Sequence, residues 1–204
     1  LDEVYAKLGV TFDEWLGESA YDSMLAGVID ELVNKGVARE DQGALCVFFE
    51  DDPELSKVET PFIVRKKDGA ALYATTDIAT LMYRRDKFHA SESLYVVDAR
   101  QALHFKQLFA TARKLGIEMK MEHVGFGSIL GTDGKPLKTR DGVSVTLASL
   151  LDEAETRAAA RIREEGLDVP EDELLKVASA VGIGAVKYAD LRQNRVSDYQ
   201  FDWD

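Results

Sequence analysis

The sequence is poor in cysteine, histidine and proline. Among 204 residues there are one cysteine, three histidines and four prolines. The single cysteine, Cys46, excludes an internal disulfide and a thiolate-cluster metal site, and it fits a reducing compartment such as the cytoplasm. Because Cys46 lies in an apolar run, we expect a buried and unreactive thiol. The histidines, His89, His104 and His123, have no metal-ligand spacing, so we expect no metal site.

Long apolar runs and an excess of positive charge are also missing. No stretch reaches the roughly 18 apolar residues of a membrane span, so we expect no membrane association. The chain has 37 acidic and 25 basic residues and a net charge of −12, which opposes nucleic-acid binding over the whole surface but leaves room for a local basic site. The first residue is not methionine, and two aromatics stand among the last four residues. We therefore expect a fragment of a longer protein.

A strand, a helix and a second strand follow one another between residues 94 and 126. Residues 94–97 are apolar and predict a strand buried on both faces. A helical period over residues 103–115 ends at Gly116, and a strand pattern follows at 119–126. Short joints between these elements predict a parallel crossover unit. Ligands bind beyond the carboxyl ends of such strands, so we expect function at residues 98–101 and 126–131.

The first part of the chain has a different pattern. Residues 1–36 predict two helices, and residues 44–49 and 61–66 predict an antiparallel hairpin around the acidic loop 50–60. We interpret that loop as solvated rather than as a metal site. The turn at Asp68-Gly69 marks the expected boundary of this subdomain, near Gly69.

A helix start with two interpretations follows the turn. Thr75 or Thr76 can cap a helix that continues to Arg85. Tyr73 and Asp77 would lie on one face of this helix if its first turn extends back. A first-turn acid interacting with the helix dipole accounts for Asp77 alone, but it does not account for Tyr73.

The glycine-rich loop 131–142 carries three cations, Lys135, Lys138 and Arg140, in an otherwise acidic chain. One interpretation is an ordinary charged surface loop. The other is a clamp for a polyphosphate at the carboxyl edge of the sheet. The spacing is not that of a P-loop, and spacing alone leaves both interpretations open. A long charged helix and an apolar helix at 174–191 follow, in which Gly182 and Gly184 would let a neighbour approach closely.

With these residues in view, the chain resembles arginyl-tRNA synthetases, a family of class I aminoacyl-tRNA synthetases. The resemblance covers essentially the whole chain and rests on the ordered succession of its motifs. These are Gly17-Glu18-Ser19, Asp68-Gly69, Tyr73-Ala74-Thr75-Thr76-Asp77, Asp98-Ala99-Arg100-Gln101 with His104, Phe126-Gly127, Gly131-Thr132-Asp133-Gly134-Lys135, Lys138-Thr139-Arg140, Leu150-Leu151-Asp152-Glu153-Ala154 and Val181-Gly182-Ile183-Gly184-Ala185-Val186-Lys187-Tyr188.

The resemblance implies an activity and a set of roles. The family activates L-arginine with ATP, with Mg²⁺ expected, to arginyl-adenylate and transfers the arginine to tRNA(Arg), usually needing tRNA for activation. The substrate-binding residues would be Tyr73 and Asp77 at the guanidinium and Gln101 near the α-amino group. ATP would be bound by His104, Phe126, Gly127, Ile129 and Lys138. The residues that steady the pyrophosphate would be Lys135, Lys138 and Arg140, in the place of the Lys-Met-Ser-Lys-Ser signature, from which residues 137–140 depart by lacking the second lysine.

The resemblance also implies an α/β fold: half of a Rossmann-type parallel-sheet nucleotide-binding domain with an inserted α+β subdomain and C-terminal helices. The expected division is residues 1–69 for the inserted subdomain, 70–146 for the second half of the catalytic domain, and 147–204 for helices leading toward an anticodon-binding domain. The His-Ile-Gly-His motif of class I enzymes is absent from these 204 residues. We therefore expect this fragment to be inactive alone. We also expect a monomer in the cytoplasm.

Two alternatives to a piece of a working ligase stay open. One is a stand-alone module that binds arginine or nucleotide without catalysis. The other is a different nucleotide-dependent ligase or nucleotidyl transferase on a related fold.

Overall fold

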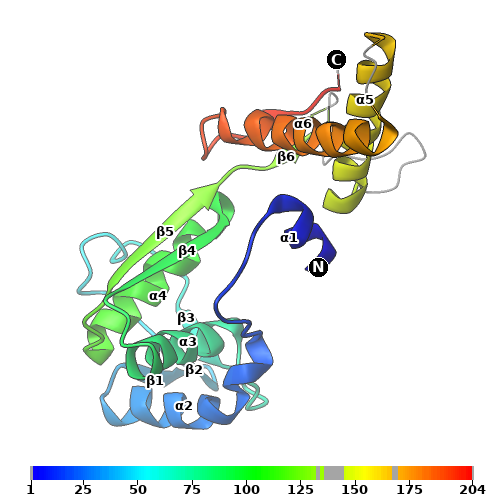
Figure 1. Cartoon of the computed structure of the whole chain (residues 1–204). Coiled ribbons are helices and arrows are strands. Elements are labelled where there is room, and N and C mark those ends of the chain that lie inside the picture. Colours follow the sequence, from blue (N-terminus) through cyan, green and yellow to red (C-terminus); the bar gives the residue numbers. More distant parts are fainter. Residues whose placement is uncertain (1, 132–133, 136–144, 167–169, 204) are drawn as a thin grey trace. The chain divides into compact units, whose positions relative to one another are not determined.

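The computed structural model describes residues 2–131, 134–135, 145–166 and 170–203. The chain divides into two compact units, Trp15–Gly125 and a unit formed by Leu1–Glu14 with Phe126–Asp204 (Figure 1). Lys138 and Arg140 lie outside the described residues. No described helix combines the length and the apolar character that crossing a membrane requires.

The unit Trp15–Gly125 begins with helices and a small antiparallel sheet. Its elements are the 3-10 helix η1 (Glu18–Met24), α2 (Leu25–Asn34), β1 (Ala38–Asp41), β2 (Ala44–Val47) and β3 (Phe62–Arg65). The predicted hairpin is confirmed, since β2 pairs antiparallel with β3 and Val47 lies opposite Phe62. The strand β1, which the pattern did not single out, adds to the other side of β2.

The rest of this unit is α3 (Tyr73–Lys87), β4 (Glu92–Asp98), the 3-10 turn η2 (Ala99–Gln101), α4 (Ala102–Leu115) and β5 (Lys120–Phe126). The predicted strand–helix–strand order is confirmed, with β4 and β5 as neighbours in one sheet. Gly116 ends α4 with a φ of 78°, the left-handed conformation that glycine adopts without steric cost.

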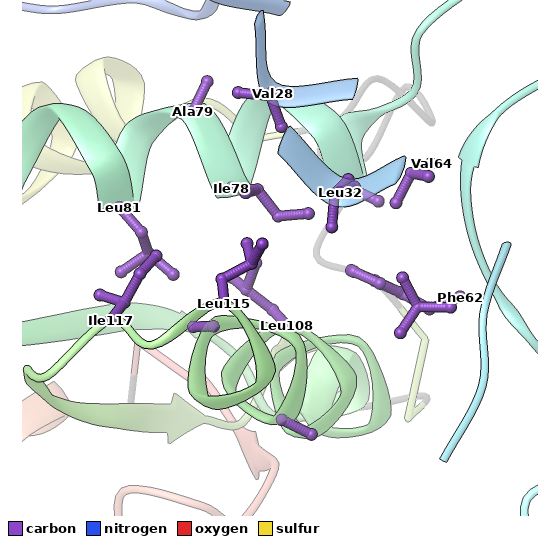
Figure 2. Close-up of a cluster of buried hydrophobic side chains, with 14 of the residues drawn as sticks. Val28, Leu32, Phe62, Val64, Ile78, Ala79, Leu81, Leu108, Leu115 and Ile117 are labelled. Carbon is purple, nitrogen blue, oxygen red and sulfur yellow. The ribbon is translucent and has the colours of Figure 1, made fainter. Parts of the chain in front are cut away.

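One hydrophobic core joins these elements. Figure 2 shows α3 contributing Ile78 and Leu81 toward Leu108 and Leu115 of α4, with Leu32 of α2 nearby. All five side chains are at most 2% exposed. The core contains side chains from both sides of the turn at Gly69, and the division at residue 69 stays a prediction.

The expectation that residues 94–97 are buried on both faces is wrong. In β4 the side chains alternate, with Ser93 and Tyr95 buried while Leu94 and Val96 are 52% and 65% exposed. The buried face packs on α4, where the rings of Tyr95 and Phe105 lie 4.9 Å apart. An apolar run alone does not reveal whether both faces of its strand are covered, because the cover comes from distant segments.

The start of α3 also differs from the prediction. The helix begins at Tyr73, and Thr75 is its third residue rather than its N-cap. The Thr75 hydroxyl accepts a long hydrogen bond of 3.5 Å from the Leu72 amide and donates to the Val64 carbonyl of β3. A contact with β3 therefore helps to set where the helix starts. The earlier start means that Asp77 is not a first-turn acid, so the dipole interpretation is wrong.

The acidic loop after β2 is exposed at Glu50, Asp51 and Glu54, as expected, and three of its carboxylates also pair with α4. Lys114, Arg113 and Lys106 of α4 form ion pairs with Asp51, Asp52 and Glu54, at 2.6, 3.2 and 3.2 Å. Leu55 of the loop is buried in the core. Ion pairs with α4 and the apolar side chains of Leu55 and Val58 thus hold the loop against the core.

The second unit consists of α1 (Asp2–Leu8), β6 (Ile129–Leu130), α5 (Leu147–Glu164), α6 (Glu171–Leu191) and β7 (Tyr199–Gln200). Helices α5 and α6 pack on each other, and Gly182 allows their close approach, since a Cβ there would lie 2.6 Å from the Ala154 carbonyl oxygen. Gly184 faces open space. The expectation that α6 is a core helix holds for one stripe only, because Val181 and Tyr188 are 54% and 70% exposed.

Candidate functional site

Helix α3 presents two of the predicted substrate-binding residues on one face. Tyr73 is its first residue and Asp77 its fifth, and residues four apart in a helix are neighbours on its surface. The Tyr73 side chain is 67% exposed, whereas the Asp77 side chain is 30% exposed. The arrangement offers a phenol and a carboxylate to a ligand that approaches this end of α3.

Asp77 is bonded to a residue from the next helix. Its Oδ2 lies 2.6 Å from Nε2 of His104, the third residue of α4. The imidazole is wedged among aromatic rings, 5.4 Å from Phe62 and 5.2 Å, edge to face, from Phe105. The resemblance predicted both residues but not this contact, which joins the predicted guanidinium site to a residue predicted for ATP.

The segment between β4 and α4 brings Gln101 to the same end of α4. Asp98 caps the turn by accepting 2.8 Å and 2.6 Å hydrogen bonds from the amide and the Nη2 of Arg100. Gln101 follows as the exposed last residue of η2 and the N-cap of α4. The strand end at which the sequence located function therefore carries Gln101 and, one helical turn later, His104.

Tyr95 lies buried between this site and the core. Its ring packs on Phe105 and Phe109, and the Arg84 guanidinium lies 4.9 Å above it. Burial raises the pKa of Tyr95 to about 12, and the nearby charge of Asp77 adds to the shift while Arg84 opposes it. Arg84 donates to the Ser93 hydroxyl at 2.6 Å, and the Tyr95 hydroxyl has no hydrogen-bond partner among the described residues.

The other predicted nucleotide-binding residues lie around β6. Phe126 is 39% exposed, and Ile129 pairs in parallel with Tyr199 of β7. The Gly127 amide donates 2.8 Å to the Arg195 carbonyl, and a Cβ at Gly127 would fall on the Ser197 carbonyl. Glycine is thus required here by the approach of residues 195–198.

The basic loop is only partly described. The Gly131 amide donates 2.8 Å to the Lys135 carbonyl, Gly134 has a φ of 71°, and Lys135 is exposed. The predicted pyrophosphate residues Lys138 and Arg140 lie outside the described residues. The described residues of the loop fit both the clamp and the surface-loop interpretation.

The sequence missed the contact between Asp77 and His104 because these residues are 27 positions apart. The nearest signal in the sequence was that both residues lie near the starts of the consecutive helices before and after β4. Two such helix starts can be neighbours, but their spacing in the sequence does not say so.

Comparisons with known proteins match the whole chain to one family. Residues 1–203 match the family model described as tRNA synthetases class I (R), catalytic domain. The arginine–tRNA ligase of Alteromonas mediterranea is 52% identical over 100% of this chain and 36% of that protein, and that of Idiomarina loihiensis is 50% identical over 98% and 36%.

Solved structures show the same fold. Arginyl-tRNA synthetase from Plasmodium falciparum matches with a TM-score of 0.81 and 29% identity over 100% of this chain and 33% of that chain. The Thermus thermophilus enzyme, at 20% identity, has a TM-score of 0.78 and supports the fold alone. The chain spans about a third of the length of the curated relatives it matches. It belongs to the class I arginyl-tRNA synthetase family and represents part of the catalytic domain.

Proposed function

We propose that this chain is part of an arginine–tRNA ligase that activates L-arginine with ATP and transfers it to tRNA(Arg). In this reaction a carboxylate oxygen of arginine attacks the α-phosphorus of ATP and pyrophosphate leaves. A terminal hydroxyl of the tRNA then attacks the carbonyl carbon of the adenylate, and AMP leaves. The family match over residues 1–203 supports the reaction class, and it disfavours a different nucleotide-dependent ligase or nucleotidyl transferase on a related fold.

The observation that carries the proposal is the pairing of Tyr73 and Asp77 on one face of α3, beside the start of α4. A guanidinium is a planar fork of donors, and a carboxylate with a phenol oxygen provides matching acceptors. Gln101, at the end of β4, is proposed to bind the α-amino group. A lysine substrate would lose the paired geometry and leave polar groups without partners, which is the basis of selectivity.

For ATP we propose Phe126, Gly127 and Ile129 as part of the adenine pocket. The amides of Gly127 and Ser128 already donate to the Arg195 carbonyl and the Asp198 carboxylate. The ring of Phe126, which is 39% exposed, is one group of this stretch that can contact adenine.

We further propose that the cations of loop 131–142, Lys135, Lys138 and Arg140, stabilise the charge on the pyrophosphate as it leaves, with Lys138 also binding ATP. The resemblance adds His104 to the nucleotide site and Mg²⁺ as the expected companion of ATP. From the same resemblance we propose that β4–α4–β5 belongs to the second half of a Rossmann-type catalytic domain, formed by residues 70–146. Residues 1–69 would be the inserted subdomain, and residues 147–204 would be helices leading toward an anticodon-binding domain. A monomer in the cytoplasm is proposed with it.

The test is Asp77→Asn in the full-length protein that carries these residues. We expect arginine-dependent ATP–pyrophosphate exchange, measured with tRNA present, to lose about 10–100-fold in kcat/KM for arginine, because a hydrogen bond to a charged group is worth about 1.5–3 kcal/mol. Discrimination against lysine should fall as well. The matched control is Asp86→Asn in the last turn of the same helix, an exposed acid paired with Arg85 at 2.6 Å.

Two results would count against the proposal. Unchanged discrimination between arginine and lysine in Asp77→Asn would remove Asp77 from the pocket. A wild-type protein that binds arginine without any exchange activity would instead favour the stand-alone binding module.

A further inference from the structure

The strongest unassigned feature is the contact between His104 and Asp77. The two side chains are about equally accessible, 28% and 30%, and their 2.6 Å separation is short for a nitrogen–oxygen hydrogen bond. They come from different helices, α4 and α3, whose inner faces are joined through the core. The contact therefore links two rigid elements rather than two mobile surface side chains.

The imidazole has little freedom to move away. Phe62 of β3 lies on one side of the ring and Phe105 meets it edge to face. Phe105 is itself 4% exposed and stacks on His123 at 4.7 Å. A ring held in this way presents Nε2 in a set direction, which is the property of a group that orients a neighbour.

We infer that His104 is a positioning residue for the carboxylate that binds the substrate guanidinium. This inference rests on the proposed function of Asp77. The Nε2–H donates to Oδ2 and thereby fixes the plane of the carboxylate. An ionised carboxylate accepts at about four lone-pair positions on its two oxygens, so Oδ1 and the rest of Oδ2 stay available to the forked donors of a guanidinium.

The consequence concerns specificity. A freely rotating carboxylate can follow a point-like ammonium as well as a planar fork, whereas a fixed one matches the fork better. Fixing it before arginine arrives also lowers the entropy lost on binding. His104 would therefore favour arginine over lysine without touching either substrate.

This role and the nucleotide-binding role suggested by resemblance predict effects on different substrates. A residue that orients Asp77 changes KM for arginine and leaves KM for ATP alone. A residue that contacts the nucleotide does the reverse. The two roles can thus be separated by kinetics on one set of variants.

The experiment compares His104→Ala and His104→Gln with wild type in the full-length protein, by ATP–pyrophosphate exchange with tRNA present. Glutamine keeps an N–H donor near the Nε2 position, and alanine removes it. We expect His104→Ala to raise KM for arginine at least about tenfold and to reduce the preference for arginine over lysine, with KM for ATP within about twofold. His104→Gln should recover most of both losses.

His89→Asn is the matched control, because His89 is exposed just after α3 and has a φ of 50°, which asparagine tolerates. It should behave as wild type. Circular dichroism of each variant confirms that the fold is retained, and a retained fold with lost arginine affinity supports the inference.

Three outcomes would overturn it. An increase in KM for ATP with KM for arginine unchanged would assign His104 to the nucleotide. Equal defects in the alanine and glutamine variants would show that ring packing, not the hydrogen bond, matters. Unchanged kinetics in His104→Ala would show that Asp77 does not depend on His104 for its orientation. The proposed function is tested separately. If the wild-type protein shows no arginine-dependent exchange, the proposed function is wrong, and this is known before any variant is made.

Discussion

Two glycines of α6, two residues apart, should respond in opposite directions to the same substitution. A methyl group at Gly182 would lie 2.6 Å from the Ala154 carbonyl oxygen, 2.7 Å from its carbon and 2.8 Å from the Glu155 amide nitrogen. At Gly184 a methyl group would meet nothing within 4 Å. Backbone atoms of α5 cannot swing aside as a flexible side chain would, so the two helices must separate in Gly182→Ala.

The magnitude follows from two terms. Replacing glycine by alanine inside a helix stabilises by about 1 kcal/mol, and this term is common to both variants. Overpacking at Gly182 costs about 1–3 kcal/mol and applies there alone. We therefore expect Gly184→Ala to be more stable than wild type by up to about 1 kcal/mol. The difference between the two variants isolates the steric cost of about 1–3 kcal/mol.

The assay is thermal and urea unfolding of the 204-residue chain, followed by far-UV circular dichroism. The unit that holds α5 and α6 has fewer than 100 residues. A change of 1 kcal/mol moves the melting temperature of such a unit by roughly 4–8 °C, so the variants should differ by roughly 4–24 °C. Both substitutions lie in the same helix, so a transition that arises from Trp15–Gly125 is common to both. If Gly182→Ala melts at or above Gly184→Ala, the close approach of α5 and α6 is refuted.

Three further predictions concern the acidic loop, the cysteine and the isolated chain. The hydrogen bond from Lys114 lowers the pKa of Asp51 below its usual 3.8, so stability from this pair is present above that value and lost as the pH falls through it. Because Asp51 is 73% exposed, the effect should be small. Lys114→Met should therefore flatten acid unfolding only slightly, and a steeper acid profile in this variant would contradict the pairing. Cys46 is 2% exposed, and burial raises the pKa of its thiol. Iodoacetamide should therefore modify Cys46 slowly in the native chain and quickly in urea. Rapid modification of the native chain would refute the burial of Cys46. The purified 204-residue chain should not aminoacylate tRNA, and detectable arginylation would disprove that expectation.

The local elements of the central unit follow from short-range patterns. Gly116 ends α4 because glycine adopts the left-handed conformation of this helix end without steric cost. The predicted strands at 44–49, 61–66 and 119–126 appear within a few residues of their expected limits. Tyr73, Asp77, Gln101 and His104 were named because their motifs resemble those of arginyl-tRNA synthetases.

Other features required the folded chain. Whether Leu94 and Val96 are covered depends on which segments pack against β4, and α3 starts at Tyr73 in part because Thr75 reaches the Val64 carbonyl of β3. The need for glycine at position 127 comes from residues 195–198, about seventy positions further along the chain.

The sequence by itself was enough for the family, through the ordered succession of its motifs, and for most helices and strands of the central unit, though not for β1, because these depend on short-range patterns. The tertiary structure alone decided that His104 meets Asp77, since α3 and α4 pack on each other through a core to which both contribute. A contact across 27 residues has no local signature. It exists because the buried faces of the two helices fix where the starts of the helices lie.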